Sequence, residues 1–95
     1  MDVARITLIG RLTSDPEPQK GEVKLSLAVR YQWKTSQAKQ RAGSELVIVY
    51  ATGKLAAICK VHLHTRSRIY CEAHLDHGRF MADELIMLGS PKRAD

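Results

Sequence analysis

Two segments in the first third of the chain alternate residue by residue between two faces, and this alternation constrains the fold more than any other feature of the sequence. In the first segment, residues 4–12, one face is formed by Ile6, Leu8, Gly10 and Leu12. The second segment, residues 23–33, repeats the alternation and ends at Trp33. A period of two residues is that of a β-strand with one buried face. Gly10, inside the first strand, predicts the bulge or sharp bend that a barrel corner requires.

The next segments continue the pattern of strands and connections. Residues 15–21 contain Pro16, Pro18 and Gly21 and predict the connection between the first two strands. Residues 34–44 are polar and predict a long hairpin loop. Residues 45–52 are a nearly unbroken apolar, β-branched run. Such a run predicts a strand covered on both sides, by the core on one side and by another element, such as a partner subunit, on the other.

A single change of period interrupts the strands. Residues 54–64 have apolar residues at helical spacing (Leu55, Ile58, Cys59, and His62 or Leu63) and predict one short amphipathic helix. Residues 68–75 and 79–88 then predict two strands joined by a tight turn at residues 76–78. The order of three strands, one helix and two strands predicts an all-β fold with one short helix. It is the order of the five-stranded Greek-key oligonucleotide-binding (OB) barrel.

The composition limits the class of protein. Ninety-five residues suffice for one small domain, expected at residues 1–90, with residues 91–95 as a short basic tail. No apolar stretch is long enough to span a membrane and no signal peptide is recognised, so an intracellular, soluble chain is expected. Cys59 and Cys71 lie within patterned segments and are expected to be buried free thiols. A disulfide between them is the alternative, and it would need an oxidising compartment.

The net charge is +5, which suits a polyanionic partner, and nucleic acid is the commonest one. The basic residues of the predicted loop support this interpretation, because residues 34–44 contain three cations and no acid. Ordinary surface charge is the competing explanation.

Five segments resemble, in order and spacing, the bacterial and mitochondrial-type single-stranded DNA-binding protein family. They are residues 6–17 (ITLIGRLTSDPE), the strand ending in Trp33, residues 53–57 (GKLAA), residues 68–75 (RIYCEAHL) and residues 85–89 (LIMLG). The resemblance covers nearly the whole chain. It implies an OB-fold protein that binds single-stranded DNA with little sequence preference, coating and protecting it in replication, recombination or repair.

The sequence departs from the family pattern at several positions. Leu46 stands where a Trp is usual, Thr52 replaces an aromatic residue, Thr65-Arg66 replaces Lys-Gly, and Ala73 replaces Gly. The chain also ends in PKRAD instead of the acidic tip that recruits replication partners, and the last hairpin is short. These departures leave two alternatives open. One is a primosome-type OB accessory or scaffold protein that binds a replication partner, and the other is an RNA-binding OB subunit.

Binding a single strand without sequence preference requires aromatic faces for the bases and cations for the phosphates. The resemblance implies stacking roles for Trp33 and Phe80, and Tyr31 is a candidate as a neighbour of Trp33. The candidate phosphate-binding cations are Arg5, Arg11, Arg30, Lys34, Lys39, Arg41, Lys54 and Arg79. A solvated surface charge is the competing interpretation for each.

The family commonly forms dimers or tetramers, so a homo-oligomer is expected. The resemblance assigns Tyr70 to the subunit interface, and the apolar strand adds Leu46, Ile48 and Tyr50. Other replication proteins are candidate partners, and a membrane is not. The expected location is the cytoplasm, in association with the nucleoid, or the mitochondrial matrix if this is a mature chain.

No enzymatic or cofactor chemistry is indicated. Cys71 and His74 have opposite strand parity and point apart, and no cysteine pair has the spacing of a zinc site. The sequence has no nucleophile motif and no phosphate-cradling loop. We therefore expect a binding protein without a metal, a cofactor or a catalytic residue.

Overall fold

The computed structural model describes the backbone of residues 4–34 and 40–89 and the side chains of residues 4–30 and 43–89. Six strands and one helix follow each other along the chain. They are β1 (Arg5–Leu12), β2 (Glu17–Gln19), β3 (Glu22–Lys34), β4 (Gln40–Thr52), α1 (Gly53–His62), β5 (Arg68–Asp76) and β6 (Arg79–Gly89). Within the described part of the chain, no helix is long and apolar enough to cross a membrane.

Five of the strands close into a barrel, as the sequence predicted. The strand order is β1-β5-β6-β4-β3, and a further pairing of β1 with β3 closes the ring. All of these pairs are antiparallel except β4 with β6, which run parallel at Val49–Phe80 and Tyr50–Met81. The fold is therefore the five-stranded mixed barrel of the OB class.

The barrel interior confirms the predicted alternation. The inward residues of β1, β3, β4 and β5 form one cluster with residues of α1, including Leu12, Leu25, Leu27, Val49 and Ile69. Cys59 and Cys71 are both buried and free, as expected. Burial raises the pKa of the Cys59 thiol to about 11 and that of Cys71 to about 12, so both thiols stay neutral at physiological pH.

Two predictions about connections were wrong. Residue 34 and residues 40–44, predicted as part of a loop, are strand, because β3 and β4 stay paired from Arg30–Ser44 to Lys34–Gln40. The polar sequence of residues 34–44 lacks the apolar alternation by which a strand is recognised. The connection at residues 15–21 also contains a short strand, β2, which pairs with the start of β3.

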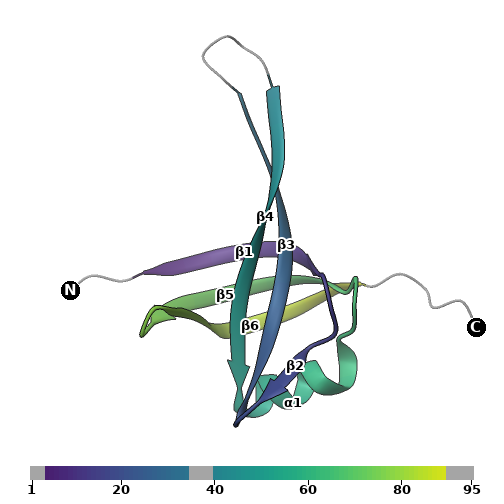
Figure 1. Cartoon of the computed structure of the whole chain (residues 1–95), viewed down its shortest axis with the longest axis vertical. Coiled ribbons are helices and arrows are strands. Elements are labelled where there is room, and N and C mark those ends of the chain that lie inside the picture. Colours follow the sequence, from purple (N-terminus) through teal and green to yellow (C-terminus); the bar gives the residue numbers. More distant parts are fainter. Residues whose placement is uncertain (1–3, 35–39, 90–95) are drawn as a thin grey trace, which may run out of the picture.

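The ribbon formed by β3 and β4 extends well past the other strands, while α1 lies at the opposite end of the barrel (Figure 1). The helix buries Ala56 and Cys59, and Leu63 follows as its buried C-cap. The predicted helix face was therefore partly wrong, since Ile58 is 43% exposed. The predicted turn is confirmed, with Gly78 in the left-handed region at φ 79°.

Candidate nucleic-acid interface

The outer face of the β3–β4 ribbon carries a strip of small, apolar and basic side chains. Across the two strands, Lys24 pairs with Tyr50, Ser26 with Ile48, Ala28 with Leu46 and Arg30 with Ser44. Directly opposed residues of antiparallel strands share a face. The alternate residues of both strands are the core residues, so this strip lies outside the barrel. Leu46 is 61% exposed, so in a single chain one side of the strand predicted at residues 45–52 is uncovered.

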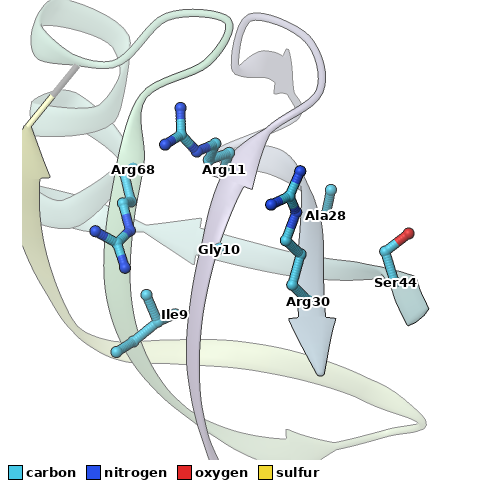
Figure 2. A pocket seen from close by; sticks show the side chains of 7 residues that line it. All are labelled: Ile9, Gly10, Arg11, Ala28, Arg30, Ser44 and Arg68. Atoms are coloured by element: carbon cyan, nitrogen blue, oxygen red, sulfur yellow. The ribbon is translucent and has the colours of Figure 1, made fainter. Parts of the chain in front are cut away.

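Next to this strip, the surface is hollowed where β1 meets β3. The hollow has a volume of about 850 Å³ and is lined by Ile9, Gly10, Arg11, Ala28, Arg30, Ser44 and Arg68. We call it the arginine groove. Its three arginines come from three strands, Arg11 from β1, Arg30 from β3 and Arg68 from β5, and Figure 2 shows them around Gly10. All three are exposed.

Two of the groove arginines stand directly opposite each other. Arg11 pairs with Arg68 in the β1–β5 register. Like charges at directly opposed positions of a sheet are destabilising, and a guanidinium cannot relieve the repulsion by losing its proton. Among the described residues, no ion pair is formed by Arg11, Arg30 or Arg68. The groove therefore concentrates positive charge that the described side chains do not neutralise.

Gly10 forms the floor of the groove because only a residue without a side chain fits there. Gly10 pairs with Ile69 of β5, and from the next residue β1 also pairs with β3, at Arg11–Ala28. A Cβ added at Gly10 would lie 2.9 Å from the carbonyl oxygen of Ala28 and 3.2 Å from Cγ2 of Val29. The glycine thus permits the close approach that brings Arg11 beside Arg30. The sequence had predicted a bend here, and the structure adds a backbone contact.

The sequence predicted Arg11 and Arg30 as nucleic-acid contacts but missed Arg68. Strand parity could have identified Arg68 as an outward-facing residue, because the inward residues of β5 are Ile69, Cys71 and Ala73. The register of β5 against β1, which brings Arg68 to Arg11, could not be read from the sequence.

The other predicted cations lie apart from the groove. Arg5 is six residues from Arg11 along β1, or roughly 20 Å, and it lies opposite His74. Lys54 is exposed in the first turn of α1. Arg79 donates a hydrogen bond to Oε1 of Glu22 at 2.9 Å, and this bond is the main cause that raises the pKa of Arg79. The side chains of Lys34, Lys39 and Arg41 lie outside the described residues.

Four aromatic residues divide into two with described packing contacts, Phe80 and Tyr50, and two whose backbones alone are described, Tyr31 and Trp33. Phe80 is half-buried and packs against the core. The ring of Tyr50 lies under the guanidinium of Arg79, 4.6 Å from ring centroid to Cζ. Tyr31 and Trp33 belong to the ribbon, where their backbones pair with Gly43 and Arg41. The side chains of Tyr31 and Trp33 lie outside the described residues.

Tyr70 lies on the outer face of the β1–β5–β6 sheet. It pairs with Ile9 on one side and Ile86 on the other. Both isoleucines are 46% exposed, so the three side chains form an apolar row across three strands. The next row on the same face contains Glu72 and Glu84, again directly opposed.

Within residues 4–34 and 40–89, no group of three His, Cys, Asp or Glu side chains could hold a metal ion.

Comparison with known proteins agrees with this geometry. The profile of the single-strand binding protein family matches residues 3–85. No curated protein matches this sequence. Among solved structures, the chain is similar to the single-stranded DNA-binding protein of Plasmodium falciparum in complex with single-stranded DNA. The TM-score is 0.78 at 15% identity, over 94% of this chain and 97% of the other.

Two further structures are similar. One is the small single-stranded DNA-binding protein of Streptomyces coelicolor, with a TM-score of 0.71 and 16% identity over 92% of this chain and 95% of the other. The second is the mitochondrial single-stranded DNA-binding protein Rim1 of S. cerevisiae, with a TM-score of 0.69 and 13% identity over 96% of this chain and all of the other. At these identities the likeness establishes the fold.

Proposed function

The chain belongs to the single-strand binding protein family, and from this premise we propose that it coats and protects single-stranded DNA with little sequence preference during replication, recombination or repair. The proposed role is to bind the nucleic acid, and no catalysed reaction is part of it. Relatives in Streptomyces and in yeast mitochondria support a location either in the bacterial cytoplasm at the nucleoid or in the mitochondrial matrix.

The arginine groove is the observation that carries this proposal. It is open, positively charged and lined by side chains from three strands, so it suits an extended polyanion more than a small enclosed ligand. Arginine forms short, charge-assisted hydrogen bonds with phosphate oxygens. Contacts to phosphates hold a strand without reading its bases, which agrees with binding of little sequence preference.

We propose that the bases lie along the β3–β4 ribbon. Arg30 and Ser44 belong both to the groove and to the outer face of the ribbon, so the two surfaces are continuous. Leu46 and Ile48 continue that face and offer apolar contact to bases, with Tyr50 beyond them. Stacking on Trp33 and Tyr31 would add roughly 1–3 kcal/mol per base. Phe80, packed against the core, is not among the stacking residues that we propose.

We also propose as phosphate contacts Lys34 and Arg41, whose backbones belong to the ribbon, and Lys39, which lies outside the described residues. For Arg79, the pairing with Glu22 makes an additional phosphate contact less favourable, because the carboxylate already neutralises it. We retain Arg5 and Lys54 as minor contacts for the ends of a longer strand.

We further propose a homo-oligomer in which the apolar row of Ile9, Tyr70 and Ile86 is covered by a second copy. Exposed apolar rows of this kind mark protein contacts. Leu46, Ile48 and Tyr50, which the sequence suggested as interface residues, lie on the outer face of the β3–β4 ribbon, along which we place the bases, so we assign them to the nucleic acid. Sedimentation equilibrium tests this proposal. Self-association that Tyr70→Arg abolishes would support it, and a wild-type mass of 10.6 kDa would contradict it.

The function is tested by titrating the chain with oligo-dT at low and moderate salt, using the fluorescence of Trp33, its only tryptophan. Saturable quenching that weakens with salt would support single-strand binding and the stacking role of Trp33. Binding detected by anisotropy of labelled DNA, but without quenching, would support the function and remove Trp33 from the site. No binding by either method would overturn the proposal in favour of a protein-binding accessory role.

A further inference from the structure

An arginine near the groove has a backbone conformation that arginine avoids. Arg66, in the connection from α1 to β5, has φ 76°. Among the described residues, only Arg66 and His77 are non-glycine residues with positive φ. This region is unfavourable for a residue with a Cβ, and glycine occupies it without that penalty. The side chain of Arg66 is exposed, so no packing in the described chain accounts for it.

Among the described residues, Arg66 contributes to its turn through its backbone alone, while side chains of Thr65 and Ser67 make further bonds there. The N–H of Arg66 donates to the carbonyl oxygen of Leu12 at 2.8 Å, and the N–H of Leu12 donates to the carbonyl oxygen of Ser67 at 2.9 Å. The N–H of Ser67 bonds to His64 at 3.0 Å. Glycine at position 66 would make the same bonds without the penalty. The turn therefore gives no reason for a long cationic side chain, and a strained residue of this kind points to a functional role.

The position of Arg66 suggests what that role is. Its backbone is bonded to Leu12, the neighbour of Arg11, and it lies two residues before Arg68. It therefore follows directly on the row of arginines that crosses from β3 over β1 to β5. We propose that Arg66 continues the arginine groove as a phosphate-binding residue. The four arginines would then form a track for the phosphodiester backbone of a single strand.

This track runs across the strands of the barrel. The track leads the DNA from the ribbon, over Gly10, to the loop that precedes β5. Each strand that it crosses advances it by roughly 4.8 Å, the spacing of neighbouring strands. The proposal rests on the proposed function, since it names the path of the same ligand. It predicts that Arg66 contributes about 0.7 to the slope of log K against log salt, the value for one neutralised phosphate of a single strand.

Three variants of Arg66 separate its charge from its conformation. Arg66→Gln removes the charge and keeps the strained backbone, Arg66→Lys keeps both, and Arg66→Gly removes both. Affinity for labelled oligo-dT of about 20 nucleotides, longer than the roughly 4–16 nucleotides that one OB fold covers, is measured by anisotropy between about 50 and 200 mM salt. The control is His77→Gly, which relieves the second positive φ, 51°, in the turn between β5 and β6.

We expect Arg66→Gln and Arg66→Gly to lose about 0.7 of the salt slope and roughly eightfold in affinity at 50 mM salt, since the affinity from one phosphate contact scales as the molar salt concentration to the power of about −0.7. Arg66→Lys should retain both values. Arg66→Gly should also raise Tm by roughly 2–8 °C, so binding and stability change in opposite directions. His77→Gly should raise Tm and leave the salt slope unchanged.

Two outcomes would overturn the inference. The first is a salt slope for Arg66→Gln equal to that of the wild type, which would leave single-strand binding intact and exclude Arg66 from the path. The second is an equal loss of slope in His77→Gly, which would make the effect unspecific. A wild-type chain that does not bind oligo-dT would instead contradict the proposed function itself.

Discussion

The outer face of the β1–β5–β6 sheet contains two pairs of like charges, at its two ends, and they differ in how their repulsion is relieved. Arg11 and Arg68 are directly opposed across β1 and β5. Glu72 and Glu84 are directly opposed across β5 and β6, four residues further along β5. Each arrangement is unfavourable when both members are charged. The apolar row containing Tyr70 lies between them.

A carboxylate pair has a means of relieving its repulsion, because a carboxyl group can bind a proton. The hydrogen bond with Glu84 is the main cause that raises the pKa of Glu72 above its ordinary value of 4.5. Desolvation and the negative charges of Glu84 and Asp83 act in the same direction, and Arg5 opposes them. Two opposed carboxyl groups can thus reduce their repulsion by taking up a proton, without a partner outside the chain.

The arginine pair has no such means of relief, since a guanidinium stays protonated at every physiological pH. Only an anion can neutralise it, and no described side chain does so. The two pairs therefore differ in that the acidic pair can be relieved by a proton, whereas the cationic pair calls for an anion, which we propose to be the phosphates of a single strand. Substitutions at one pair should leave the other pair unchanged.

The largest effect is expected from removing all three groove charges. In the variant Arg11→Gln/Arg30→Gln/Arg68→Gln, the salt slope for oligo-dT should fall by about 2 and the affinity at 50 mM salt by roughly 500-fold, because three phosphate contacts are lost. Anisotropy titrations measure both. The control, Lys20→Gln/Lys60→Gln, removes two charges outside the groove. An equal loss per charge in the control would mean that net charge, not the groove, holds the DNA.

Reversing one charge should separate stability from binding. Arg68→Glu converts the like-charge pair into an attractive one, so the free energy of unfolding should rise by about 0.2–1 kcal/mol. The affinity for oligo-dT should fall roughly 60-fold at 50 mM salt, because Arg68 is lost and Arg11 becomes paired. Urea denaturation and anisotropy measure the two effects. A stability that falls would contradict the placement of Arg68 opposite Arg11.

Closing the floor of the groove should destabilise the barrel. In Gly10→Ala, the added methyl group meets the backbone oxygen of Ala28, which cannot move without disturbing the β1–β3 pairing. We expect a loss of roughly 1–3 kcal/mol in the free energy of unfolding, the usual cost of overpacking. Thr7→Ala, on the exposed side of the same strand, is the control. A Gly10→Ala variant as stable as this control would show that β1 and β3 have room to separate.

The smallest effect is expected at the acidic end. Because the pKa of Glu72 is raised in the folded state, its contribution to stability is fully present below the unfolded value and is lost as the pH rises through the folded value. Glu84→Gln should therefore flatten the decrease of Tm between about pH 4 and pH 8 and leave oligo-dT binding unchanged. Glu17→Gln is the control. A Tm profile of Glu84→Gln identical to that of the wild type would show that the two carboxyl groups do not interact.

The parts of the fold that the sequence predicted are those decided by local patterns. Alternation in residues 4–12 and 23–33, the change of period after Gly53 and the turn at Gly78 were sufficient for the barrel. The continued pairing of β3 with β4 beyond Arg30 was not predicted, because residues 34–44 are polar and carry no apolar alternation. The helix face was misjudged at Ile58, since helical spacing does not determine how far the helix is rotated against the barrel.

The candidate site was less predictable because it depends on register. Arg11 and Arg30 were predicted as phosphate-binding cations, but their meeting with Arg68 follows from the β1–β5 and β1–β3 pairings. Arg79 was predicted as another such cation, yet its partner Glu22 is 57 residues away in sequence. Contacts between residues so far apart are set by the packed barrel, and no short motif encodes them.

The most direct test of the arginine groove is a crystal structure of the chain with bound oligo-dT. We predict phosphate oxygens within about 2.7–2.9 Å of the guanidinium nitrogens of Arg11, Arg30 and Arg68, with the strand crossing β1 at Gly10. The account would be contradicted by a strand that occupies another face of the barrel and leaves these three guanidinium groups in solvent.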